Sequence, residues 1–171
     1  MEFVSWFDKL LYIKSKHGDI EGVKYALANG GKVSTRSPIG LTPLLVAAQN
    51  GHRDICGLLL AAGSDVNEVY PLTQQTALIL AAQSGHVEIV QDLLRWGAAI
   101  DHQDYTRATS LHAACEQGHL ACVLALVKAG ASMNLANEDE ALPIHVAAGF
   151  NRVEVVKALL ELGCSPNMVR Q

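Results

Sequence analysis

The chain has 171 residues, of which 50% are hydrophobic and 18% are charged, and its formal net charge at pH 7 is −4. This apolar content excludes a wholly disordered chain. No lysine and arginine run occurs, so we expect neither nucleic acid nor an anionic membrane as a partner. No apolar run approaches the roughly 20 residues of a membrane span, and the first residues lack a signal-peptide pattern. The four cysteines are therefore expected to be reduced thiols in an intracellular protein, cytoplasmic or nuclear.

Three series of residues recur along the chain with a period of 33 or 34 residues. The first series closes each unit and consists of Gly30, Gly63, Gly97, Gly130 and Gly163. The second consists of Gly18, Gly51, Gly85, Gly118 and Asn151. The third consists of Thr42, Thr76, Thr109 and Leu142. A shared period of this length indicates stacked copies of one supersecondary unit.

The first expected element is a helix that begins near residue 5. Ser5 and Asp8 have the spacing of a helix-capping box. Lys14 and Ser15 stand where later units have two small residues, which is typical of a terminal repeat with one solvated face. Packing onto this first unit is expected for Phe3, Phe7, Leu10 and Leu11.

The second unit shows how one copy is expected to fold. Thr42 can cap a helix that begins at Pro43, because its hydroxyl accepts from the first free backbone N–H groups. Gly51 ends that helix, since the residue past a helix end often needs a positive φ. A second helix follows over residues 53–62 and ends at Gly63. Residues 64–75 have turn residues and no helical period, so they are expected to form an extended or hairpin-like loop.

The later units depart from this pattern at a few positions. The turn glycine of the loop occurs only as Gly40, and Gln74, Arg107 and Glu140 replace it, which allows those turns to differ in shape. Asn151 is expected to take the conformation of the glycine that it replaces. Trp96, late in a second helix, is expected to cover the stack locally, with an exposed anchor on the convex side as the alternative.

The segment TPLLVAAQNGHRDICGLLLAAGSDVN, residues 42–67, resembles the ankyrin repeat, and the resemblance covers nearly the whole chain. It implies an all-α solenoid of about five stacked helix-turn-helix units with β-hairpin-like loops, in one domain over residues 1–171. The predicted units are residues 4–36, 37–70, 71–103, 104–136 and 137–169. The last unit keeps apolar residues where a closing repeat should be polar, so we expect a fragment of a longer protein. These residues are Val153, Val155, Val156, Leu159, Leu160 and Leu162.

One group of side chains has the composition of a zinc site: His112, Cys115, His119 and Cys122. In the repeat register both cysteines replace core residues, where cysteine behaves as a small hydrophobe. The resemblance implies that the histidines make hydrogen bonds within the stack. No phosphate-binding glycine motif occurs. We therefore expect no metal, no cofactor and no enzymatic activity.

The variable positions are expected to carry the function. In this architecture the loop tips and the exposed ends of the first helices line one concave side, which is predicted to bind a protein or peptide with apolar and basic groups. The predicted binding residues are Ile39, Leu41, Gln49, Tyr70, Leu72, Gln75, Gln83, Tyr105, Arg107, Glu116, Gln117, Glu138, Asp139, Glu140 and Phe150. The alternative is a regulatory or substrate-recognition domain of a larger protein, such as a ubiquitin-ligase adaptor, a channel or an enzyme. The fourth unit is itself similar to repeats of adaptors that carry a SOCS box.

Overall fold

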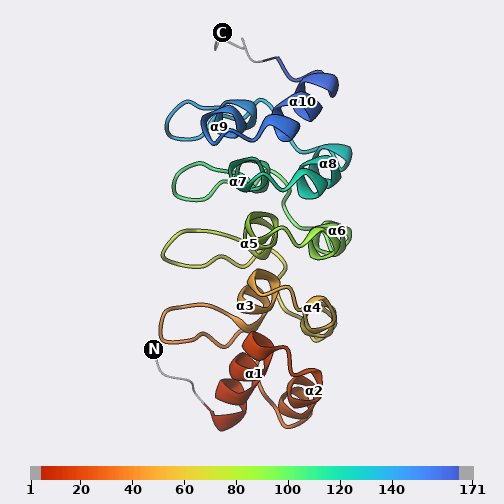
Figure 1. Ribbon diagram of the computed structural model, residues 1–171. Coiled ribbons are helices and arrows are strands. Elements are labelled where there is room, and N and C mark those ends of the chain that lie inside the picture. The colour runs from red at the N-terminus through yellow and green to blue at the C-terminus, as the bar shows by residue number, and fades with distance from the viewer. Residues whose placement is uncertain (1–4, 166–171) are drawn as a thin grey trace.

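The computed structural model describes residues 5–165, in which helices pair into five helix-turn-helix units. The first helices are α1 (Trp6–His17), α3 (Pro43–Gln49), α5 (Ala77–Ser84), α7 (Ser110–Gln117) and α9 (Pro143–Gly149). The second helices are α2 (Ile20–Ala28), α4 (Arg53–Ala61), α6 (Val87–Arg95), α8 (Leu120–Lys128) and α10 (Val153–Glu161). The two sets form two columns, and long loops project beside the first helices (Figure 1). Within residues 5–165 the strand-like pairing is limited to one isolated antiparallel bridge, Val69–Thr76, so the predicted all-α solenoid is confirmed.

Threonine caps begin three of the first helices, as predicted. The Thr42, Thr76 and Thr109 hydroxyl oxygens accept from the backbone N–H three residues later, at 3.4, 3.4 and 3.5 Å. In the fifth unit Leu142 has no capping hydroxyl. Its N–H donates to His145 Nδ1 at 3.2 Å, a contact that the fourth unit also makes, between Thr109 N and His112 Nδ1.

The turn between the two helices of a unit joins that unit to the preceding one. The side chains of His52, His86 and His119 each donate from Nε2 to a carbonyl of the preceding unit, at 3.1 Å in all three cases. Arg152 takes this place in the fifth unit, and its Nε donates to the carbonyl of Glu116 at 2.8 Å. The predicted structural role of these histidines is thus confirmed as a contact between units.

Positive φ angles occur where glycine was expected and also where it is absent. Asn151 has φ 57°, as predicted for the substitute of a turn glycine. In the loops, Gln74, Arg107 and Glu140 have φ 60°, 59° and 59°, beside 93° at Gly40. The loop turns therefore share a left-handed residue. The N–H groups of Arg107 and Glu140 donate to the carbonyl three residues earlier, as that of Gly40 does, whereas Gln74 N donates to the carbonyl of Tyr70, four residues earlier, so the turn at Gln74 differs in shape.

The terminal units differ in two respects from expectation. Ser15 is fully buried, and its hydroxyl has no hydrogen-bond partner within the described residues, so the predicted solvated face does not include it. Ser5 caps Asp8 N at 3.1 Å, whereas the Asp8 carboxylate accepts from Lys32 N at 2.8 Å and does not complete a capping box. Phe3 lies outside the described residues. In α10 Val155 and Leu159 are buried, while Val153, Leu160 and the residue just past the helix, Leu162, are exposed.

Leu93→Ala should destabilise the whole stack, because Leu93 is fully buried in α6. The lost burial and the cavity should lower the free energy of unfolding by about 2–5 kcal/mol. Urea denaturation measures the loss, with Gln91→Ala as a control because Gln91 is exposed on the same helix. Equal stability of the two variants would contradict the burial of Leu93.

Gly85→Ala should cost more stability than Gly97→Ala. The two glycines share a positive φ, 80° and 86°, so an added Cβ strains both backbones similarly. A Cβ on Gly85 would also lie 2.8 Å from the His119 ring, whereas none would meet Gly97 within 4 Å. We expect an additional loss of about 1 kcal/mol or more for Gly85→Ala in urea titrations, because the ring must move. Equal losses would show that the ring packing is unimportant.

Candidate functional site

The loop tips and the adjoining first helices form one continuous surface, here called the loop-side face. Neighbouring tips are joined by backbone hydrogen bonds. Tyr105 N donates to the carbonyl of Thr73 at 3.0 Å, and Glu138 N donates to the carbonyl of Thr106 at 2.8 Å. These bonds use only backbone atoms, so they fix the order of the tips and leave the side chains free to vary.

The predicted apolar residues divide into exposed and buried ones. Ile39, Leu72 and Tyr105 have 57%, 67% and 63% of their surface exposed. Tyr70 is half-buried against the core. Leu41 is only 9% exposed, so its expected place on an exposed tip is wrong. It directly precedes the helix cap of α3, where the chain has already turned toward the core.

The predicted polar residues lie at the ends of the first helices and on the last three tips. The exposed ones are Gln49, Gln83, Arg107, Glu138, Asp139 and Glu140, and Gln75, Glu116 and Gln117 are half-buried. Phe150, at the end of α9, is also exposed. The carbonyls of Gln49, Gln83 and Glu116 accept the contacts between units, so these residues serve the scaffold through their backbone.

A pocket of about 370 Å³ opens on this face between the third and fourth units. Five of the predicted residues line it: Leu72, Gln75, Gln83, Tyr105 and Glu116. The structure adds six residues that the sequence did not indicate: Thr73, Ile79, Asp104, Thr106, Ala108 and Ala113. We name it the tip pocket, because two loop tips and two first helices, α5 and α7, supply its lining.

A small residue at one repeat position makes room for the tip pocket. Ala113 stands where three other units have Val46, Leu80 and Val146, as the repeat period shows. Its missing carbons leave space above α7, beside the buried side chain of Ile79. Comparison of the units column by column would have shown this substitution in the sequence.

Hydrogen bonds hold the polar rim of the tip pocket in place. Asp104 Oδ1 accepts from the N–H and the hydroxyl of Thr106, at 2.9 and 2.7 Å, and from Ala108 N at 3.0 Å. The Thr73 hydroxyl donates to Gln75 Oε1 at 3.1 Å. The rim is therefore organised before any partner arrives, which reduces the entropy lost on binding.

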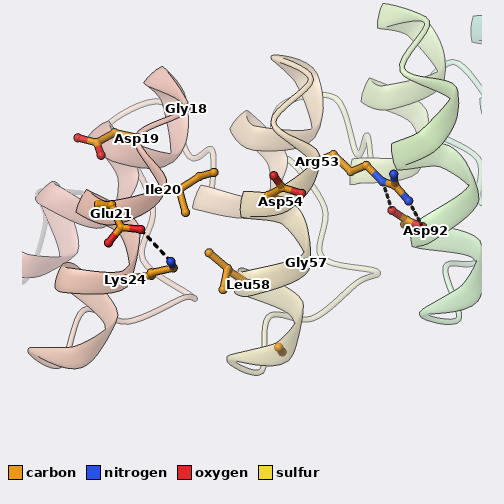
Figure 2. Close-up of a pocket in the computed structure, with 11 residues that line it drawn as sticks. Gly18, Asp19, Ile20, Glu21, Lys24, Arg53, Asp54, Gly57, Leu58 and Asp92 are labelled. Carbon is orange, nitrogen blue, oxygen red and sulfur yellow. Dashed lines mark hydrogen bonds and ion pairs between the residues drawn. The ribbon is translucent and has the colours of Figure 1, made fainter.

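A second and larger hollow, of about 1050 Å³, lies on the opposite side among α2, α4 and α6. Figure 2 shows Ile20 and Leu58 on its walls and Gly57 on α4, where other units have longer side chains. Most of its charged groups are paired, since Lys24 bonds Glu21 at 2.8 Å and Arg53 bonds Asp92 at 2.6 Å. The Arg53 hydrogen bond also lowers the pKa of Asp92. With most of these charges neutralised and Ile20 and Leu58 half-buried, this hollow offers a partner less than the tip pocket, whose Leu72 and Tyr105 are exposed.

The zinc-like group of side chains belongs to the scaffold. Cys115 and Cys122 are fully buried, which confirms their predicted place in the core. His112 Nδ1 accepts from Thr109 N at 3.2 Å and its Nε2 donates to the carbonyl of Ala141 at 3.1 Å. Burial lowers the pKa of His112, so the ring is neutral and links the fourth unit to the fifth. Across residues 5–165 there is no group of three or more potential metal ligands.

Trp96 follows α6 and is 49% exposed, so it covers the stack only in part.

None of the helices within residues 5–165 combines the length and apolar character needed to cross a membrane.

The cysteines should react slowly with alkylating agents while the protein is folded. Burial raises the pKa of Cys115 to about 12 and that of Cys122 to about 11, so little thiolate forms at neutral pH. Mass spectrometry of the alkylated protein should show slow labelling in buffer and fast labelling in denaturant. Gln91→Cys, at an exposed site, should add one fast thiol as a positive control. Fast native labelling, or protection that a chelator removes, would contradict the core assignment.

Comparison with known proteins agrees with this architecture. A family described as ankyrin repeats, in three copies, matches residues 11–104 and 97–170. The chain is also similar to the Caenorhabditis elegans protein named Ankyrin repeat and KH domain-containing protein mask-1, with 38% identity over 92 residues. The aligned region is 53% of this chain but 4% of that protein, so the chain spans a small part of the relative's length.

Proposed function

Because the chain belongs to the ankyrin repeat family, we propose that it binds another protein through the loop-side face, with the tip pocket at the centre of the contact. Ankyrin repeats are generally protein–protein interaction modules without catalytic activity. The observation that carries the proposal is the position of Leu72 and Tyr105, two exposed apolar side chains that flank one pocket on a rigid face. Large apolar side chains around a pocket are typical of binding hot spots.

The charge of this face favours a partner with basic groups. Five carboxylates lie on or beside the last two tips and α7, and they are Asp104, Glu116, Glu138, Asp139 and Glu140. Two guanidinium groups, of Arg107 and Arg152, lie in the same region. The excess of negative charge supports fast encounter with a positively charged segment. We place this binding in an intracellular setting, in keeping with four free cysteines.

A second candidate is substrate recognition within a larger protein. The chain aligns with only 4% of the length of its relative mask-1. This similarity favours the second candidate, because the remaining parts of such a protein could act on the partner that this face binds. The binding step would be the same in both cases, and only its consequence would differ.

Leu72→Ala and Tyr105→Ala should each weaken binding of peptides selected from a random-peptide display library against the folded chain. Loss of an anchor should cost on the order of 1–3 kcal/mol, mainly through faster dissociation. Tyr25→Ala and Trp96→Ala are the matched controls, since both aromatic residues are exposed outside the tip pocket. Surface plasmon resonance measures the rates. Losses confined to the controls would move the interface to the other side of the stack.

Replacing Glu138, Asp139 and Glu140 by Lys should slow association and reduce its dependence on salt. The same measurements test this, because rim charges steer the encounter while the apolar anchors hold the complex. Unchanged association rates at low salt would show that the acidic tip lies outside the binding surface.

A further inference from the structure

The tip pocket differs from the rest of the loop-side face in having an apolar floor open to the outside. Ile79 and Ala113 form that floor and are themselves nearly inaccessible, while Leu72 and Tyr105 stand exposed on the walls. A volume of about 370 Å³ lies near the lower limit of roughly 300 Å³ for ligand pockets. The space therefore suits one large side chain, and a rigid apolar pocket of this size gains most when such a group displaces its water.

Two carboxylates stand at the same pocket, and their surroundings differ. Asp104 is held by three donors on Oδ1. The Glu116 carboxylate accepts one weak hydrogen bond, from Gln117 Nε2 at 3.5 Å. Its backbone carbonyl, in contrast, is held by Arg152. The carboxylate of Glu116 is therefore the less engaged of the two, and a partner's cation can approach it without breaking a strong existing bond.

From these contacts we infer that the tip pocket takes a single bulky apolar side chain of the partner, with a lysine or arginine beside it that pairs with Glu116. This inference rests on the proposed function and specifies the partner's chemistry. The apolar group would pack on Ile79 and Ala113 between Leu72 and Tyr105. The neighbouring cation would meet an acidic rim, whereas an acidic or phosphate-bearing partner would be repelled there.

The repeat register supplies the substitution that tests the pocket. Ala113→Leu gives the fourth unit the leucine that the third unit has at the equivalent position, Leu80. The backbone at this position therefore accommodates it. Ala121→Leu makes the same chemical change at an exposed position of α8 and is the matched control. Ala113→Val, which copies Val46 and Val146, fills the pocket less and guards against a folding defect. Thermal melts verify that each variant is folded.

The probes are peptides selected from the random library, each paired with a version in which its bulkiest apolar residue is alanine. For the wild-type chain the parent should bind about tenfold more tightly or better, which is the effect of one anchor. In Ala113→Leu this preference should disappear, in Ala113→Val it should shrink, and in Ala121→Leu it should persist. Glu116→Gln should weaken peptides with Lys or Arg beside the anchor by a few-fold and flatten their salt dependence, and Glu154→Gln on α10 should not.

Failure of this inference can be told apart from failure of the proposed function. If Leu72→Ala and Tyr105→Ala weaken binding but Ala113→Leu leaves the anchor preference intact, the face binds partners and the anchor pocket is wrong. If selected peptides lack a common bulky residue with a neighbouring cation, or carry acidic residues there, the inferred chemistry is wrong. If no peptide binds the wild-type chain, both proposals are contradicted.

Discussion

The stack depends on one contact, the side-chain hydrogen bond that crosses from the helix turn of each unit to a carbonyl of the unit before it. His119 and Gln83 show the usual form, and Arg152 preserves the contact with a different side chain. The bond needs a glycine such as Gly85 beneath the ring, because a Cβ there would collide with it. Helices of 7 to 12 residues are marginal alone, so this contact and the packing it permits stabilise each unit through its neighbours.

Backbone bonds between loop tips separate the scaffold from the variable surface. Tyr105 and Glu138 are positioned through their N–H groups, and their side chains take no part in that bond. A change of side chain at these positions therefore alters what the face presents without altering how the tips are ordered. The same holds for Gln74 and Arg107, because the left-handed backbone conformation that they share tolerates different side chains.

Local signals made the helices predictable from the sequence, whereas exposure was less so. Thr42 and its equivalents cap helices through atoms three residues apart, and such contacts need no knowledge of the rest of the fold. Leu41 and Ser15 were misplaced because burial depends on where the neighbouring unit lies. The tip pocket was missed for a different reason: it arises from the carbons that Ala113 lacks, and an absent side chain is visible only by comparison with the equivalent position in other units.

The tip pocket and the larger hollow among the second helices arise from similar substitutions but differ in chemistry. Gly57 opens the larger hollow, among the second helices, as Ala113 opens the tip pocket. In the larger hollow Arg53 and Asp92 already form an ion pair, so a partner would have to break that pair or leave it unused. In the tip pocket the rim is fixed by hydrogen bonds within the loops, while Glu116 and the apolar walls remain available. The tip pocket combines a weakly engaged carboxylate with exposed apolar walls, and this combination favours the smaller of these two hollows as a recognition site.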